Sequence, residues 1–345
     1  MTGNCNLVTL LGELLVLTIF HNQVIVATNR GEGIPPVGLF TFGDSYFDAG
    51  NKLFLTENQN PPQSKWPYGK SRDDPNGKFS NGNIVPDFIA EFMGITKEIP
   101  PAFKPGVDIS RGASFAVADA SILPGTFMTL TQQVDKFRSM KSNWTDDFIG
   151  KSLFMIYIGT EVYFNFTKSK PNADASAQQA FVLSTINQLK NDINVRSECH
   201  EPLNNLAKQH NEKIGPMLND LAKKSPGLQF TIFDFYNAVL RRTRRNLNYR
   251  FYVSNTSCFG VGTHDAYGCG MGNVRSELCE YQRAYFFFDG RHNTEKAQEE
   301  FAHLIFGADT NVVQPMTLRE LIVYPFNEPM REYWQPNNST ITTDG

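Results

Sequence analysis

Residues 152–159 place the strongest constraint on the fold of this chain. They read Ser-Leu-Phe-Met-Ile-Tyr-Ile-Gly, so a strand built from them is apolar on both faces. Such a strand is typical of a parallel sheet that helices cover on both sides. Further strand-like runs occur at 38–42, 229–234 and 285–289. The pattern predicts an α/β fold.

Helical patterns alternate with these runs. Apolar residues recur at helical spacing in five segments, 84–92, 130–140, 180–194, 203–221 and 297–305. The third and fourth segments follow one another without a strand between them, so one strand is missing from a regular alternation. A chain of 345 residues, 41% of them hydrophobic, is long enough for one large domain with a full core, or for two small ones.

The N-terminus resembles a secretory signal. Residues 7–20 are mainly apolar and the small-residue end Val-Ile-Val-Ala occupies 24–27, so we expect cleavage after Ala27. A signal peptide would then occupy residues 1–27 and a single domain residues 28–345; a short hydrophobic helix is the alternative for the first segment. No later stretch approaches the ~20 apolar residues of a membrane span, so we expect no stable membrane insertion.

Four glycosylation motifs agree with a secretory route. They place candidate acceptors at Asn143, Asn165, Asn255 and Asn338. We therefore expect a glycoprotein that is secreted, or retained in the endoplasmic reticulum or vacuole. The net charge of −3 gives no support for nucleic acid or an anionic membrane as a partner.

The cysteines fit an oxidising compartment rather than a metal site. After removal of the leader, Cys199, Cys258, Cys269 and Cys279 remain, and four cysteines allow three pairings. The last three lie in one Gly-rich segment, where a disulfide would hold a loop. No pair of cysteines or histidines has the spacing of a zinc site, and we expect no metal.

Ser45 is a candidate nucleophile. It follows the apolar run 38–42 in the sequence Gly43-Asp44-Ser45. A strand that ends in a glycine turn presents its next polar side chains at the carboxyl edge of the sheet, where open α/β folds place their chemistry. A serine hydroxyl needs a partner base. The alternative is that Asp44 and Ser45 only cap a turn.

The segment Asp289-Gly290-Arg291-His292 supplies a candidate base. Across a tight turn, the Asp289 carboxylate can accept a hydrogen bond from one ring nitrogen of His292, which leaves the other nitrogen to take a proton from Ser45. The alternative is that Asp289 caps a turn and His292 is exposed. His200 and His264 are weaker candidates, and two further histidines of the mature chain lie in helical patterns.

Together these segments resemble the plant GDSL esterase/lipases. The matching blocks occur in the family's order at 43–51, 112–116, 158–160 and 288–295. The resemblance implies the flavodoxin-like three-layer α/β/α fold of SGNH hydrolases with a parallel sheet. It also implies hydrolysis of carboxylic esters through an acyl-enzyme, with a small-molecule ester or lipid as substrate and no cofactor.

The resemblance also assigns roles to individual residues. Ser45 is expected to be the nucleophile, His292 the base and Asp289 the residue that orients it. The oxyanion hole would be formed by the backbone N–H groups of Ser45 and Gly112 and by a side-chain amide at position 161.

Two departures from the family pattern bear on activity. Position 161 carries Glu161 in place of an asparagine, and an ionised carboxylate cannot donate. Loss of one oxyanion donor costs roughly 10²–10³ in rate, whereas a protonated Glu161, kept neutral by burial, could still donate. The family also has a strand between the two long helices that this chain lacks. Its absence would leave backbone groups unpaired or change the pairing of the last strands.

Two C-terminal segments, 261–270 and 307–315, resemble the crucifer myrosinase-associated and epithiospecifier-modifier branch of the family. This branch implies association with a myrosinase complex and an influence on glucosinolate breakdown. A catalytically impaired partner protein is therefore the alternative to an active esterase.

Overall fold

The computed structural model describes most of the chain. It covers residues 24–28, 37–56, 61–73, 75–170, 203–224, 228–243, 251–269, 274–308 and 310–323, with short parts of 173–185. Most of the helix expected at 180–194 lies outside these residues, as do Cys199, His200 and Asn338.

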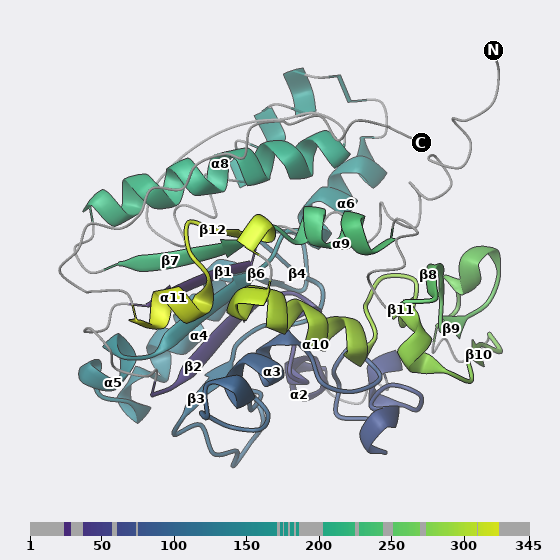
Figure 1. The fold of residues 1–345 in the computed structure, drawn as a ribbon, viewed down its shortest axis with the longest axis horizontal. Helices are drawn as coiled ribbons and strands as arrows, with labels where there is room; N and C mark the ends of the chain where they lie inside the picture. Colours follow the sequence, from purple (N-terminus) through teal and green to yellow (C-terminus); the bar gives the residue numbers. More distant parts are fainter. Residues whose placement is uncertain are drawn as a thin grey trace.

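A six-stranded sheet forms the middle of the molecule (Figure 1). In spatial order its strands are β12 (Val313–Gln314), β7 (Gln229–Phe233), β1 (Val24–Thr28), β6 (Leu153–Tyr157), β2 (Leu39–Gly43) and β3 (Gly112–Ser114). The strands expected at 38–42, 152–159 and 229–234 are thus confirmed as neighbours or near neighbours in one sheet.

The sheet is parallel on one side and mixed on the other. β2 is parallel to β3 and to β6, with Gly43 opposite Tyr157. β1 is antiparallel to both of its neighbours, β6 and β7, and β12 is antiparallel to β7. Four strands therefore share one direction, as predicted, while β1 and β12 run against them.

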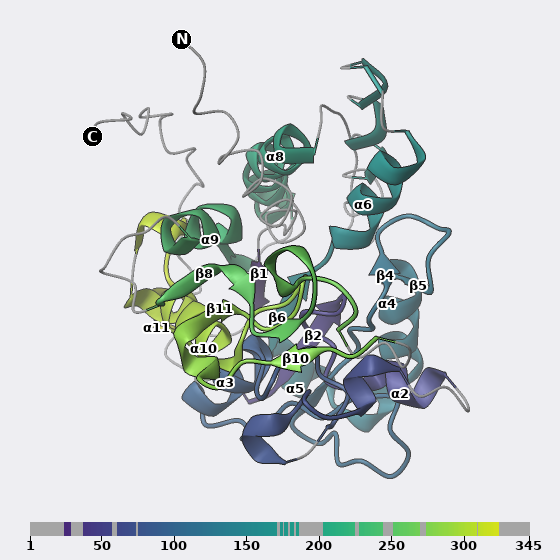
Figure 2. The same ribbon diagram turned by 90° about the vertical axis from the view of Figure 1, so that its right-hand side faces the viewer.

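Helices cover the sheet on both faces, as Figures 1 and 2 show. One face carries α3 (Val85–Phe92), α9 (Phe235–Thr243), α10 (Glu295–His303) and α11 (Leu318–Val323). The other face carries α4 (Leu130–Ser139), α6 (Thr160–Ser169) and α8 (Leu203–Lys224). These three layers are the α/β/α arrangement that the sequence predicts.

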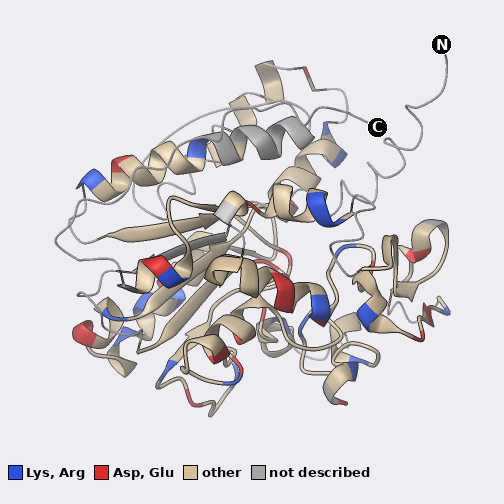
Figure 3. Ribbon diagram, viewed as in Figure 1, with Lys and Arg blue, Asp and Glu red and all other residues tan. Residues whose placement is uncertain are grey.

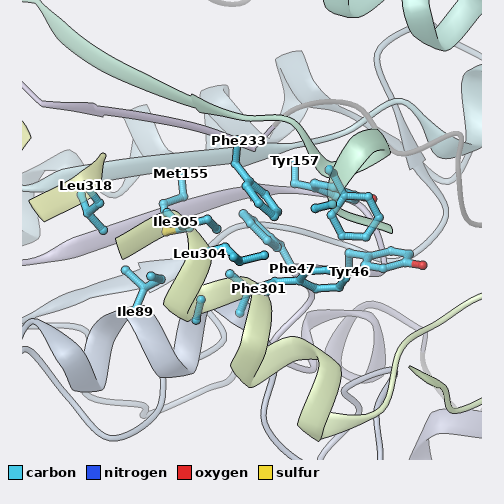
Figure 4. Close-up of a cluster of buried hydrophobic side chains, with 14 of the residues drawn as sticks. Tyr46, Phe47, Ile89, Met155, Tyr157, Phe233, Phe301, Leu304, Ile305 and Leu318 are labelled. Carbon is cyan, nitrogen blue, oxygen red and sulfur yellow. The ribbon is translucent and has the colours of Figure 1, made fainter. Parts of the chain in front are cut away.

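Alternating residues of the strands pack into two separate hydrophobic cores. Met155 and Tyr157 of β6 join Phe301 and Leu304 in the first core (Figure 4), whereas Phe154 of the same strand packs against the second. Fully burying one such side chain stabilises a protein by about 1.5–3 kcal/mol. The apolar residues on both faces of β6 therefore fix this strand between the two helical layers.

The helices begin where the sequence supplies a cap. Pro86 occupies the first turn of α3, and the Asp87 side chain accepts the backbone N–H of Ile84 at 3.0 Å. Thr129 caps α4, and Thr294 caps α10.

The long polar segment 50–79 contains a short helix, α2 (Asn51–Leu55). The Asp48 carboxylate accepts the backbone N–H groups of Gly50, Asn51 and Lys52, and so satisfies the first turn from outside the helix. That carboxylate also accepts the N–H of Ala118 at 2.7 Å, which ties the helix to the segment after β3.

One C-terminal expectation needs correction. The run at 285–289 forms β11 (Tyr285–Phe287), but it pairs with β8 (Val253–Ser257) and not with the central sheet. The chain beyond Val313, which has no clear pattern, supplies β12 and α11. β12 reaches the sheet because Asp234 donates its backbone N–H to the carbonyl of Val312 at 2.7 Å, just past the end of β7.

The remaining elements are short. They are α5 (Asp146–Gly150), β4 (Ala120–Ser121), β5 (Met128–Thr129), β9 (Phe259–Gly260), β10 (Glu277–Leu278), a π turn (Leu304–Ala308) and 3₁₀ turns at Pro62–Ser64, Lys70–Arg72, Lys141–Asn143, Thr263–Asp265, Gln282–Ala284 and Thr310–Val312. Lys and Arg side chains and Asp and Glu side chains are both scattered over the molecule (Figure 3).

Within the described ranges, no helix has the length and apolar character needed to cross a membrane.

β1 lies where the sequence predicts the end of a leader. Val24–Thr28 pairs with β7 along its whole length and with β6 through Ile25, Val26 and Ala27. β1 is therefore the strand between β6 and β7 in the central sheet.

Removal of β1 should destabilise the fold strongly. A chain that starts at residue 29 leaves the facing edges of β6 and β7 unpaired, and each buried unpaired backbone group costs about 1–3 kcal/mol. We expect this chain to melt at least ~10 °C lower than a control chain that starts at residue 23 and keeps β1, measured by circular dichroism. Equal melting temperatures would show that β1 contributes nothing to the sheet.

Candidate active site

Ser45 lies at the carboxyl edge of the sheet, two residues after β2. The turn depends on Gly43, whose φ of +146° places any added Cβ within 1.9 Å of the Tyr157 carbonyl oxygen. The Gln133 side-chain carbonyl accepts the backbone N–H of Gly43, and the Gln133 amide N–H donates to the Gly43 carbonyl, each at 2.8 Å. Asp44 then donates its backbone N–H to Tyr157 at 3.1 Å. These bonds fix the direction in which Ser45 leaves the strand.

The structure brings Ser45, His292 and Asp289 together. The Ser45 hydroxyl lies 2.8 Å from Nε2 of His292. Nδ1 of the same ring lies 3.0 and 2.9 Å from the two carboxylate oxygens of Asp289. All three side chains are buried. A hydroxyl, an imidazole and a carboxylate in this order can pass a proton from the serine to the histidine while the carboxylate stabilises the charged ring.

Four donors surround the Asp289 carboxylate. Besides His292, it accepts the backbone N–H of Arg291 at 2.8 Å and that of His292 at 2.7 Å, and the Tyr68 hydroxyl donates to it at 2.8 Å. Burial by itself raises the pKa of Asp289, but the charge of His292 and these hydrogen bonds outweigh burial and lower the pKa to about 2. Asp289 therefore stays ionised at neutral pH.

Aromatic rings hold the His292 imidazole in place. The ring centre of Phe79 lies 4.6 Å from that of His292, and the ring centre of Tyr46 lies at 5.2 Å. The Tyr46 hydroxyl also donates to the carbonyl of Arg291, the residue before the histidine. These contacts restrict the ring to the plane in which both of its nitrogens have a partner.

Glu161 does lie beside the site, but it is paired. As the second residue of α6 it forms an ion pair with Arg291, with Oε1 and Nη2 separated by 2.7 Å. A carboxylate that faces a guanidinium accepts and does not donate. The arrangement therefore offers no support for a protonated Glu161 acting as a hydrogen-bond donor.

Asp44 is a second buried carboxylate at this edge. It accepts the backbone N–H of Tyr46 at 3.3 Å and that of Thr160 at 3.4 Å. Burial, with a smaller contribution from the charge of Glu161, raises its pKa to about 6. Asp44 thus links the serine turn to the start of α6.

The structure contradicts the expected role of Gly112. In the sheet Gly112 is opposite Leu39, at the start of β2, whereas Ser45 follows the end of that strand. Its backbone N–H donates to the carbonyl of Ile109 at 2.9 Å. Val117 lies closer to Ser45, since its N–H donates to Gly43 at 3.0 Å. A short motif match cannot show which end of a strand its glycine occupies.

Of the expected oxyanion donors, only the backbone N–H of Ser45 fits. It donates to no group among the described residues, so it is free to bind an acyl oxygen. Gly112 is too far along the strand, and Glu161 is an acceptor.

The other predicted residues lie away from Ser45. Asn143, Asn165 and Asn255 are exposed, as glycosylation acceptors must be. Cys258 and Cys279 form a disulfide, and Cys269 is free. In the described part of the chain, no group of three or more His, Cys, Asp or Glu side chains is arranged to hold a metal ion.

The competing histidines have other surroundings. His210 is buried and bonded to the Tyr163 hydroxyl at 2.7 Å, and burial lowers its pKa to about 3. His303 stacks on Phe92 at the end of α10. His264 lies in the 3₁₀ turn at Thr263–Asp265.

Sequence reasoning missed three side chains that contact the site. Tyr68 and Phe79 come from the long segment after α2, and they reach Asp289 and His292 across more than two hundred residues of sequence. Arg291 lies within the fourth block but has no role in its pattern. The Trp-Pro-Tyr at 66–68 is the only local signal, since it predicts an apolar anchor in a polar loop.

Comparison with known proteins identifies close relatives. The model of the family described as GDSL-like lipase/acylhydrolase matches residues 39–305. The Arabidopsis thaliana GDSL esterase/lipase ESM1 is 66% identical, over 99% of this chain and 96% of the relative. The inactive GDSL esterase/lipase-like protein 23 of the same plant is 61% identical, over 98% of this chain and 96% of its own. GDSL esterase/lipase 22 is also 61% identical, over 97% and 94%.

Replacement of Tyr68 by phenylalanine should lower the stability of the folded protein. The change removes one hydrogen bond to a charged acceptor, which contributes about 1.5–3 kcal/mol. We expect the free energy of unfolding in urea to fall by about that amount. The control is Tyr252→Phe, because the Tyr252 side chain is 91% exposed. Equal stability of the two variants would show that the Tyr68 hydroxyl has no structural role.

Asp289 should make stability depend on pH in the acid range. Its pKa is lowered from the usual 3.8 of an aspartate to about 2 in the folded protein. A depressed folded pKa contributes stability that is present above the unfolded pKa and is lost as pH falls toward the folded one. Between pH 4 and pH 2 this loss should be about 2 kcal/mol.

The test compares Asp289→Asn with the wild type by urea unfolding at several pH values. The stability difference between the two should be largest above pH 4 and should shrink on acidification. Asp135→Asn, at an exposed ion pair with Arg138, is the control. A difference that stays constant from pH 5 to pH 2 would contradict the ionised, hydrogen-bonded state of Asp289.

Proposed function

Because the chain belongs to the GDSL lipase/acylhydrolase family, we propose that it is a secreted serine esterase that hydrolyses carboxylic esters through an acyl-enzyme. One observation carries the assignment of the residues. The hydroxyl of Ser45, the ring of His292 and the carboxylate of Asp289 form an unbroken chain of hydrogen bonds at the carboxyl edge of the sheet.

In the proposed reaction Ser45 attacks the acyl carbonyl while His292 takes its proton. Asp289, ionised through its depressed pKa, fixes the ring and stabilises the imidazolium. The alcohol leaves with the proton from His292, and a water then attacks the acyl-enzyme with His292 again as base. The backbone N–H of Ser45 stabilises the negative oxygen in both steps.

The substrate is proposed only as a class. Aromatic rings lie around the site: Tyr46 and Phe79 contact His292, and Phe164 contacts Arg291. Apolar walls favour acyl or alcohol groups of lipid-like or aromatic character. No cofactor takes part in this scheme.

Glu161 favours a second candidate function. The oxyanion site lacks the amide donor of the family pattern, and one relative at 61% identity bears the name of an inactive esterase/lipase-like protein. The chain would then act as a catalytically impaired myrosinase-associated protein that modifies glucosinolate breakdown. Co-purification with a myrosinase, together with absent hydrolysis, would favour this candidate over an active esterase.

Secretion is proposed on independent grounds. A disulfide between Cys258 and Cys279 is typical of an oxidising compartment, and the three described sequon asparagines are exposed. Treatment of the plant-expressed protein with an endoglycosidase should reduce its apparent mass. Replacement of Asn143, Asn165 and Asn255 by glutamine should remove most of that change.

We also propose that the chain lacks one strand of the family fold. The alignment with ESM1 has 378 positions and the chain has 345 residues, so at least 33 aligned positions (378 − 345) have no residue here. The alignment covers 99% of this chain and 96% of the relative. The antiparallel position of β1, between strands that share one direction, supports placing the loss between β6 and β7.

The esterase is tested with p-nitrophenyl acetate and butyrate. The wild type should hydrolyse them at a rate that falls at least ~10³-fold in Ser45→Ala, because removal of a triad nucleophile leaves only the contribution of the remaining site. Ser110→Ala, at an exposed serine, should keep the full rate. Equal rates for the wild type and Ser45→Ala would refute the proposed activity and leave the partner role.

A further inference from the structure

Arg291 connects the two sides of the site. Its backbone belongs to the turn between Asp289 and His292, and its guanidinium reaches Glu161 on α6 at 2.7 Å. It also lies 5.0 Å from the ring centre of Phe164, one turn further along α6. The Glu161 side chain is 12% exposed and that of Arg291 32%, so bulk water screens this ion pair less than an open surface pair.

The two members of the pair belong to the segments next to both reacting residues. Gly43 is opposite Tyr157, so Ser45 and Glu161 follow the carboxyl ends of adjacent strands. The charge of Glu161 acts on Asp44, the neighbour of Ser45. Arg291 directly precedes His292, and the Tyr46 hydroxyl, bonded to its carbonyl, fixes its backbone.

Besides the ion pair, three described groups near His292 (Asp289, Tyr68 and Tyr46) keep one charge state at neutral pH. The Asp289 carboxylate is ionised, and Tyr68 bonds to it; burial raises the pKa of the Tyr68 and Tyr46 hydroxyls well above their usual value. The Cys269 thiol donates to the carbonyl of Phe259 at 3.0 Å, and burial raises its pKa to about 12. Asp44, the neighbour of Ser45, has a pKa of about 6 and so titrates in the working range.

We propose that Arg291 is a positioning residue that, through its ion pair with Glu161, keeps the surroundings of His292 electrically balanced and so sets the pH at which His292 becomes a working base. The proposal rests on the esterase function proposed above. It also explains how a carboxylate can occupy position 161 without imposing a net negative charge on the site.

The two single substitutions have predicted shifts of opposite sign, and the double substitution should cancel them. In Arg291→Met the unpaired Glu161 carboxylate favours a protonated His292, so the acid limb of kcat/KM should move to higher pH. In Glu161→Gln the unpaired guanidinium should move it to lower pH. Each shift should be about 0.5–1 pH unit, as for one partly screened charge at close range. The double variant should return to the wild-type pH.

The experiment measures kcat/KM for p-nitrophenyl butyrate from pH 4.5 to 8.5 in the wild type, both single variants and the double variant. Arg138→Met, which breaks the exposed ion pair with Asp135, is the matched control and should leave the limb in place. A purely structural pair would lower activity equally in all three variants without opposite shifts. That outcome, or shifts of the same sign, would overturn the proposal.

A second readout separates this proposal from the esterase activity and from Asp44. Histidine labelled with ¹³C gives an imidazole signal for His292, assigned by its loss in His292→Gln, and its titration is followed by NMR. Opposite shifts of the NMR midpoint in the two single variants support the role of Arg291 even if Ser45→Ala hydrolyses esters as fast as the wild type. Unchanged NMR midpoints in an active enzyme would reject the role of Arg291 and leave the esterase intact.

Discussion

The parallel pairing of β2 with β6 is the interaction on which the rest of the site depends. It runs without a break from Leu39 opposite Leu153 to Gly43 opposite Tyr157. Both strands therefore end at the same level, and the first polar residues after each end meet at one edge. Ser45 follows one end and Glu161 the other. Every other contact of the site, including the turn that carries His292, is built onto this edge.

Much of this arrangement could be predicted from local sequence. The apolar runs that become β2, β6 and β7 are typical of strands in a covered sheet. The contact between Asp289 and His292 follows from the short turn at 289–292, and Ser45 follows the end of β2. Gly112 was misplaced because a motif gives the order of residues along the chain but not their level in the sheet. The pairing of Leu39 with Gly112, which decides that level, is a long-range fact.

The contacts that sequence could not predict share one physical property. Tyr68 reaches Asp289, Phe79 packs against His292 and Arg291 pairs with Glu161 through side chains, across separations that no periodicity spans. The position of β1 is a further case, since a strand can pair in either direction with any exposed edge of suitable polarity. Its apolar sequence fits a leader and a buried strand equally well.

The place of β1 in the sheet means that removal of a leader can precede the pairing of this strand. Val24 is among the first residues to leave the ribosome, yet its partner Phe233 is made more than two hundred residues later. The β1–β7 pairing can therefore form only late, whereas a leader is recognised and removed while the chain is still being made. Cleavage after Ala27 would remove four of the five residues of β1, so a chain that has been processed early has lost the strand before its site in the sheet exists.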